Sequence, residues 1–267
     1  MTTSGRTVSI MAIIAGLLLL GISFDLLGKS ASTSVNHTQS SLQSDVKSQK
    51  SSGSTKQRLV FIDLGANRGD SYEAMLGVGK KFNYNYTIPA GRSHKEMEAH
   101  LFEANSVFDE PLKEIKAKYD KDGSYAPIYI YPSTVVYTKD TTVSFFVDHK
   151  NPAHDFWGSS LLASHPDVTA QDKVDLPAIN IARFILQNFK KEDHVVVKVD
   201  IEGAEFDTIP HLLSTGAYVN IDYLYIEWHE GVLSEEDRKV KPAKAYEALK
   251  EMVKEGVQAP TYDSAAR

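Results

Sequence analysis

The chain has 267 residues, 42% of them hydrophobic, and a formal net charge of −6 at pH 7. This length supports one sizeable core or at most two small domains. The acidic balance lacks the clustered Lys and Arg that nucleic-acid binding requires, so we expect no nucleic-acid partner. The absence of cysteine excludes disulfides, zinc–cysteine sites and a cysteine nucleophile.

The N-terminal segment contains an almost uninterrupted apolar run, Val8–Phe24, preceded by Arg6. A helix of this length spans about 25 Å, which is at the short end for a bilayer. We therefore predict a signal-anchor in residues 1–29, with a cleaved signal peptide ending near 30–32 as the alternative. Arg6 favours a cytoplasmic N-terminus and a lumenal or extracellular body, as in a single-pass membrane protein; the alternative is a secreted protein.

Residues 30–57 are rich in Ser, Thr, Gln and Lys and contain almost no large apolar side chain. Such a segment buries too little surface to offset its ordering entropy, so it is predicted to be a disordered stalk. The glycosylation sequons at Asn36 and Asn85 give weak support to a lumenal location. The remaining 58–267 are predicted to form the globular domain.

From Arg58 onward, strand patterns alternate with helix patterns. Strands are predicted over Leu59–Leu64, His100–Glu103, Pro127–Tyr131, His194–Asp200 and Ile221–Trp228, and helices over Asp70–Val78, Val107–Tyr119, Pro177–Phe189, Ala204–Thr215 and Pro242–Glu255. Val135–Asp148 suggests an antiparallel excursion, and Gly77–Lys95 suggests an inserted loop or lid. The alternation predicts an α/β fold with a doubly wound, mostly parallel sheet.

The first predicted strand ends in an acidic, glycine-punctuated turn, Asp63–Gly69. Glycines let a backbone turn sharply and approach a ligand closely, and the helix that follows offers unpaired N–H groups. An acid at a strand end can pair with the amine or hydroxyls of a ligand. This layout is typical of a nucleotide-type cofactor site, although the turn is not the dinucleotide pattern G-x-G-x-x-G.

Acidic residues recur at the ends of four predicted strands: Asp63, Glu103, Asp200 and Glu227. In an open α/β sheet the carboxyl ends of the strands face one crevice, where ligands bind. Asp63 and Glu103 are about 40 residues apart, whereas a nicotinamide fingerprint places its ribose acid about 20 residues past the glycines. The spacing argues against a nicotinamide-dependent oxidoreductase, which remains an alternative.

Four blocks stand in the order and rough spacing of one family: D-L-G-A-N-R-G at 63–69, F-E-A-N at 102–105, V-K-V-D-I-E-G-A-E at 197–205 and I-E-W-H at 226–229. The chain resembles the FkbM-type methyltransferases over roughly 59–256, with weak matching between 80 and 98. The resemblance implies a Rossmann-like class I methyltransferase that uses S-adenosyl-L-methionine. It also implies O-methylation of a sugar or other small-molecule hydroxyl, so the expected partner is a small-molecule or glycan acceptor.

The resemblance also implies roles for particular residues. The glycine turn would surround the methionine end of the cofactor, and Glu103 would accept hydrogen bonds from both ribose hydroxyls, a role that suits an acceptor-only carboxylate. Asp200 and Glu202 would border the methyl-transfer site. The residues expected at the cofactor are Asp63, Gly65, Asn67, Gly69, Glu103, Asp200 and Glu202.

The residues expected in catalysis are His229 and Asp200. Imidazole titrates near neutral pH, so His229 is the preferred general base, with Asp200 as the other candidate; a purely structural histidine beside Trp228 is the alternative. Asp200, Glu227 and His229 could also ligate a divalent metal. Strand-end carboxylates more often bind a cofactor, so no metal is assigned.

Two further segments leave alternatives open. Phe156–Leu161 is an aromatic, hydroxyl-rich loop that either closes over a ligand or simply packs. Glu205 is expected only to interact favourably with the dipole at a helix N-terminus.

Class I methyltransferases usually end in a β-hairpin, but only 257–267 remain after the last predicted helix. A shortened hairpin is therefore expected, and a non-catalytic scaffold that kept the fold is an alternative to an active enzyme.

Overall fold

The structure is a computed structural model that describes residues 57–79, 82, 84, 86–152 and 156–261. The predicted anchor, residues 30–56 of the predicted stalk and both sequon asparagines lie outside these residues. Among the helices of the described part, none has the length and apolar character of a membrane span.

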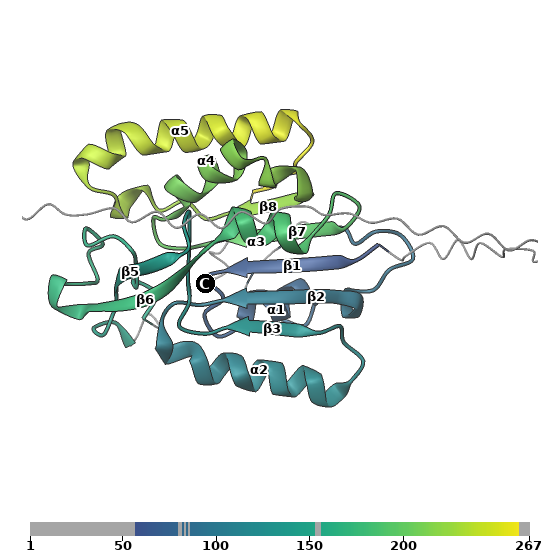
Figure 1. Ribbon diagram of the computed structural model, residues 1–267. Helices are drawn as coiled ribbons and strands as arrows, with labels where there is room; N and C mark the ends of the chain where they lie inside the picture. The colour runs from purple at the N-terminus through teal and green to yellow at the C-terminus, as the bar shows by residue number, and fades with distance from the viewer. Residues whose placement is uncertain (1–56, 80–81, 83, 85, 153–155, 262–267) are drawn as a thin grey trace, which may run out of the picture. The chain divides into compact units, whose positions relative to one another are not determined.

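Five parallel strands form the central sheet (Figure 1). In chain order they are β1 (Leu59–Leu64), β2 (Met97–Phe102), β3 (Ile128–Tyr131), β7 (His194–Val199) and β8 (Tyr223–Ile226), and their spatial order is β3-β2-β1-β7-β8. All six residues of β1 are buried, as expected for a central strand covered on both faces. The predicted Rossmann-like α/β fold with a mostly parallel sheet is confirmed.

Strand register places the ends of three strands at one level. Leu64 of β1 pairs with Phe102 of β2 and with Val199 of β7. The residues that follow these three, Gly65, Glu103 and Asp200, therefore emerge side by side at the carboxyl edge.

Helices cover both faces of the central sheet. The residues of β1 alternate between two cores: Leu59 and Phe61 belong to the core under α1 and α2, whereas Val60 and Ile62 belong to the core under the other three helices. The helices are α1 (Asp70–Met75), α2 (Asp109–Asp122), α3 (Ile181–Asn188), α4 (Glu205–Thr215) and α5 (Glu235–Lys254), and short 3-10 helices include His94–Glu96, Ser106–Phe108, Ala170–Asp172, Ala217–Asn220 and Glu230–Val232.

The insertion predicted over Gly77–Lys95 covers the sheet. Tyr84 packs edge-on against Tyr225 with ring centroids 5.0 Å apart, and Tyr86 meets Tyr223 in the same way at 5.2 Å. These two tyrosines belong to the core on the α1 side. Their apolar rings explain how this insertion can cover β7 and β8.

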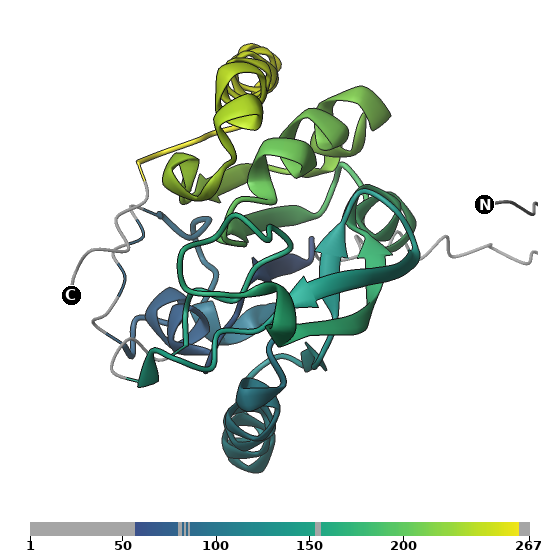
Figure 2. The same cartoon turned by 90° about the vertical axis from the view of Figure 1, so that its left-hand side faces the viewer.

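A second sheet lies beyond the carboxyl ends of the central strands, and Figure 2 looks onto this edge of the molecule. It contains β4 (Val135–Tyr137), β5 (Thr141–Phe146) and β6 (Lys173–Asn180) in the order β4-β6-β5, with β5 antiparallel to β6. The predicted antiparallel excursion is present, but β6 lies between its two strands.

The helix predicted over Pro177–Phe189 begins too early. Residues up to Asn180 are strand β6, and α3 begins at Ile181. The Asn180 side chain accepts the Arg183 N–H at 3.1 Å and so caps the helix. Asp175 lies in the strand and accepts a hydrogen bond from the Ser144 hydroxyl.

The C-terminal helix also differs from its predicted bounds, whereas the sheet edge agrees with the expected shortening. α5 begins at Glu235 rather than Pro242, because Ser234 caps it by accepting the Asp237 N–H at 3.1 Å. Past the helix, the described chain forms a single parallel bridge between Gln258 and Tyr223 in place of a hairpin. Two backbone hydrogen bonds of 2.8 Å hold this bridge to the β8 edge.

Candidate functional site

A cavity opens at the carboxyl ends of β1, β2, β7 and β8, where parallel α/β sheets bind ligands. It holds about 1050 Å³ of empty space, part of it open to solvent. Five residues expected from the sequence line it: Gly65, Asn67, Glu103, Asp200 and Glu202. Apolar side chains from the second sheet and its loops form the opposite wall, among them Val135, Phe145, Phe156, Trp157 and Leu161.

The turn after β1 requires glycine at position 65. Gly65 has φ +84°, and a Cβ placed there would lie 1.9 Å from the carbonyl oxygen of Asp200. The N–H groups of Gly65 and Ala66 both donate to the Phe102 carbonyl, at 3.0 and 2.9 Å. The turn is thereby fixed against the ends of both neighbouring strands.

Glu103 is held at the cavity wall by two backbone donors. Its Oε2 accepts the Asn67 N–H at 2.8 Å, and its Oε1 accepts the Asn105 N–H at 2.7 Å. Burial raises the pKa of Glu103 to about 7, against the opposing effect of these two bonds. Each oxygen keeps a further acceptor direction, so the carboxylate can still receive two donors from a ligand.

Lys198 forms the floor beneath the turn. Its Nζ donates to the Gly65 carbonyl at 2.7 Å and pairs with Asp63 at 3.1 Å and Asp200 at 3.2 Å. Burial alone lowers the pKa of Lys198, but the two carboxylates outweigh it and raise the pKa. Asp63 is fully buried, accepts a hydrogen bond from Ser71, and lies below the cavity rather than in its wall.

Gly69 likewise lies behind the cavity wall. It has φ +83°, and a Cβ there would lie 3.2 Å from Ile115 of α2. Gly69 therefore allows close packing between the start of α1 and α2. Of the residues expected at the cofactor, Asp63 and Gly69 are placed to support the turn rather than to contact a ligand.

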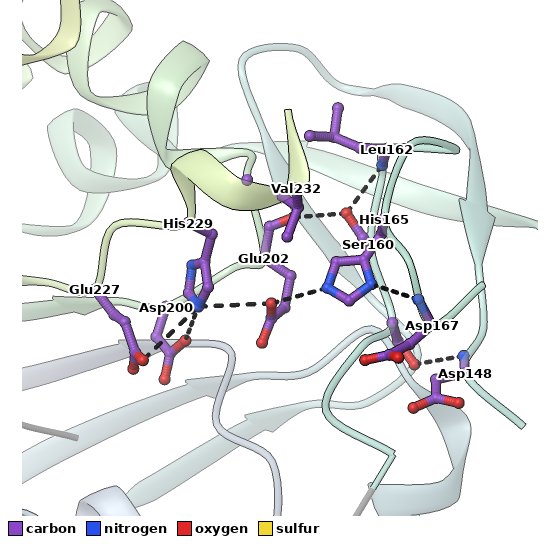
Figure 3. Close-up of polar contacts among 12 residues, drawn as sticks. Asp148, Ser160, Leu162, His165, Asp167, Asp200, Glu202, Glu227, His229 and Val232 are labelled. Carbon is purple, nitrogen blue, oxygen red and sulfur yellow. Dashed lines mark hydrogen bonds and ion pairs between the residues drawn. The ribbon is translucent and has the colours of Figure 1, made fainter. Parts of the chain in front are cut away.

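His229 lies behind the acidic edge of the cavity, where Asp200, Glu202 and Glu227 face its ring (Figure 3). Glu205 is the fourth carboxylate around it. The Nδ1 and the backbone N–H of His229 both donate to Oε1 of Glu205, at 3.0 and 2.7 Å. Its Nε2 faces Asp200, Glu202 and Glu227 at 3.8, 3.5 and 3.8 Å. Burial lowers the pKa of His229, but the hydrogen bond to Glu205 and the nearby carboxylates raise it to about 10. The arrangement therefore favours positive charge at this point.

Glu205 does more than the sequence suggested. It is the first residue of α4 and is fully buried. Its Oε2 accepts the Gly203 N–H at 2.9 Å while Oε1 holds His229. The side chain thus joins the helix start to the end of β8 and fixes the direction of the imidazole.

A loop between β5 and β6 clamps Glu202. This residue has a backbone φ of +48°, which is uncommon for residues other than Gly, Asn or Asp. The buried Ser160 hydroxyl donates to its carbonyl at 2.6 Å. His165 accepts the Asp167 N–H on Nδ1 at 3.2 Å, so its Nε2 carries the proton and donates to Glu202 Oε2 at 3.3 Å (Figure 3).

Phe156, Trp157, Ser159 and Leu161 of the Phe156–Leu161 loop line the cavity. Ser159 joins this loop to the segment that follows Glu103, because its hydroxyl accepts the Asn105 side-chain amide at 2.9 Å. Sequence reasoning did not assign Ser159, His165 or Lys198 to the site. Lys198 lies within the V-K-V-D block and Ser159 within the hydroxyl-rich Phe156–Leu161 loop, so both could have been found there, whereas nothing near His165 in the sequence points to a site.

The fold and the cavity define a class I-type α/β protein with its ligand site at the strand ends. A comparison with protein families then identifies the group: the chain matches the methyltransferase FkbM domain over residues 63–253. The chain therefore belongs to the FkbM methyltransferase family. No curated protein and no solved structure gave a match.

Proposed function

We propose that the protein transfers a methyl group from S-adenosyl-L-methionine to a hydroxyl of a sugar or another small molecule. The observation that carries the proposal is the Glu103 carboxylate. Two backbone N–H groups orient it in the cavity wall, and its remaining acceptor directions match two adjacent ribose hydroxyls.

The residues present fit this cofactor. S-adenosyl-L-methionine supplies a methyl group made electrophilic by a sulfonium. Gly65 keeps the turn free of a side chain, and Asn67 and Asp200 line the same cavity beside it. The apolar wall contributed by Val135 and Phe145 suits an adenine ring, since ligand cavities combine apolar walls with a few placed polar groups.

The acceptor side of the proposal is the acidic edge. Asp200 and Glu202 line the cavity, and His229 lies directly behind them. We propose that this edge holds the acceptor hydroxyl in line with the methyl group and receives its proton. Methyl transfer from a sulfonium depends mainly on such in-line positioning and on a deprotonated oxygen.

Calorimetry on the full chain tests the cofactor. We expect binding of S-adenosyl-L-methionine and S-adenosylhomocysteine, no binding of NAD, and a loss of about 1–3 kcal/mol in Glu103→Ala. The exposed Glu110→Gln serves as a matched control and leaves the affinity unchanged. Binding of NAD in place of both sulfur cofactors would overturn the proposal in favour of an oxidoreductase.

Transfer of a labelled methyl group to a panel of sugars and oligosaccharides tests the reaction. Label in the sugar fraction supports the proposal, and its loss in Asp200→Asn assigns the acidic edge to the transfer. Cofactor binding with no label in any acceptor favours the non-catalytic scaffold.

We also propose that residues 1–29 anchor the chain and that the methyltransferase domain faces the lumen or the cell exterior. The support is the apolar run Val8–Phe24 with Arg6 before it. Protease treatment of sealed microsomes tests this placement. Protection of the domain without detergent is the expected result, and its digestion would contradict the proposal.

A further inference from the structure

Three ligand-type atoms converge at the acidic edge of the cavity. Oxygens of Asp200 and Glu227 and the Nε2 of His229 all lie within 4.8 Å of one another. The two carboxylates follow β7 and β8, neighbouring strands that pair in parallel, and Val199 and Ile226 immediately before them are register partners. Two acids and an imidazole are therefore brought together by the sheet itself.

The distances around Nε2 do not describe hydrogen bonds. Nε2 lies 3.8 Å from Asp200 Oδ1 and 3.8 Å from Glu227 Oε1, whereas N–H···O bonds measure about 2.7–3.2 Å. Ligand atoms that share one metal ion, each about 2.1–2.2 Å from it, lie about 3–4.4 Å apart. Both Nε2–oxygen distances fall within this range.

The imidazole is oriented as a metal ligand is. His229 Nδ1 lies 3.0 Å from Glu205 Oε1. A carboxylate can only accept a hydrogen bond, so Nδ1 carries the proton. This leaves Nε2 directed at Asp200 and Glu227. A buried carboxylate that holds the far nitrogen of a ligating histidine is a recurrent feature of metal sites, and Glu205 is fully buried. The orientation of the ring is thus an observation independent of the acids it faces.

We infer that Asp200, Glu227 and His229 bind a divalent cation, and that Asp200 and His229 act on the acceptor through it. The inference rests on the proposed methyl transfer and deepens it. Two carboxylate oxygens and one imidazole nitrogen suit Mn²⁺, which accepts both donor types. Because Asp200 and Glu227 also line the cavity, the open side of the cation faces the ligand space.

A cation in this place defines a class of acceptor. It favours a molecule with two adjacent oxygens, such as a sugar diol, which can chelate the ion. A bound cation would polarise the acceptor hydroxyl, and Glu202 would take its proton. The Glu202 carboxylate accepts the His165 Nε2–H beside the site at 3.3 Å. The acceptor oxygen then takes the methyl carbon, the electron pair of the C–S bond stays on sulfur, and Glu202 releases the proton to solvent.

Binding of Mn²⁺ to the full chain, followed by electron paramagnetic resonance, tests the inference without an activity assay. We expect one saturable site, at least tenfold weaker binding in Glu227→Gln and in His229→Gln, and an unchanged site in Glu230→Gln. Glu230 is the matched control, because it adjoins His229 in sequence but its carboxylate accepts from the Tyr246 hydroxyl. Thermal unfolding of each variant confirms that it is folded.

Calorimetry with S-adenosyl-L-methionine on the same samples separates the two proposals. Cofactor binding without a saturable Mn²⁺ site, or with equal Mn²⁺ binding in folded Glu227→Gln, overturns the cation site alone. If the wild-type chain does not bind S-adenosyl-L-methionine, the proposed function is wrong instead.

Discussion

At the proposed cofactor end of the cavity, short strand-end turns supply the polar contacts, whereas at the proposed acceptor end two side chains from one distant loop supply them. Glu103 receives the N–H of Asn105, two residues away, and that of Asn67 in the neighbouring turn. Glu202 is instead fixed by Ser160 and by His165, 42 and 37 residues away, and both come from the loop of the second sheet.

The two ends of the site therefore depend on different parts of the fold. Backbone donors at the ends of paired strands are fixed once the central sheet forms. The acceptor end also requires the second sheet to deliver its loop to Glu202. Substitutions in that loop should therefore impair methyl transfer to the acceptor but leave cofactor binding unchanged. Substitutions beneath the Asp63–Gly69 turn should impair both.

The largest loss of stability is expected from Lys198→Met, which removes the ammonium group that contacts both ends of the site. The variant leaves Asp63 and Asp200 without their ammonium partner, and breaking a buried ion pair in this way costs about 3–5 kcal/mol. Urea unfolding measures the loss, with the exposed Lys191→Met changing stability by less than about 0.5 kcal/mol. A loss below about 1 kcal/mol would show that Lys198 does not join the two ends.

Gly65→Ala should have the next largest effect and strike the cofactor end. The new Cβ would overlap the Asp200 carbonyl oxygen at 1.9 Å, and the backbone there is left-handed. We expect a loss of more than about 3 kcal/mol in unfolding free energy and no measurable cofactor binding. Gly91→Ala isolates the backbone contribution, because Gly91 has φ +75° with nothing within 4 Å, and should cost about 1–2 kcal/mol. Equal losses of unfolding free energy in the two variants would contradict the close approach of position 65 to the Asp200 carbonyl oxygen.

The same division explains what could be predicted from the sequence. The central strands read as apolar runs, and parallel strands end at one edge, so Gly65, Glu103 and Asp200 could be placed together without a structure. The last four residues of β6, Pro177–Asn180, are predicted as helix, because the hydrophobic pattern does not distinguish strand from helix over so short a stretch. Their strand conformation depends on pairing with β4 and β5.

The contacts of the acceptor end could not be predicted for a related reason. His165 reaches Glu202 only after the second sheet has folded, and no local pattern marks that contact. Glu205 shows the converse. Its place at a helix start was predicted, but its bond to His229 depends on where β8 ends. Local patterns specify elements and strand ends, and tertiary contacts specify the rest.

A third prediction, on pH, tests whether Glu103 binds the cofactor as a carboxylate. Burial raises its pKa to about 7, with Lys198 opposing and Asp63 adding to the shift. The charged form accepts two ribose hydroxyls, so below pH 7 binding must first remove a proton. We expect affinity for S-adenosyl-L-methionine to fall about tenfold, or about 1.4 kcal/mol, from pH 8 to pH 6. Glu103→Gln should bind weakly and lack this dependence, and an identical profile in that variant would exclude Glu103 as its source.

The smallest effect is expected at His165, a positioning residue of the acceptor end. Gln can present an amide N–H where Nε2 lies, whereas Asn places its amide near Nδ1 and leaves Glu202 without this donor. Loss of a hydrogen bond to a charged group costs about 1.5 kcal/mol, so His165→Asn should lower kcat for methyl transfer about tenfold. His165→Gln should retain most of the rate, and both variants should bind the cofactor with affinities within twofold of the wild type. Steady-state kinetics with calorimetry separates these quantities, and an equal fall in cofactor affinity would show that the loop of the second sheet serves both ends of the cavity.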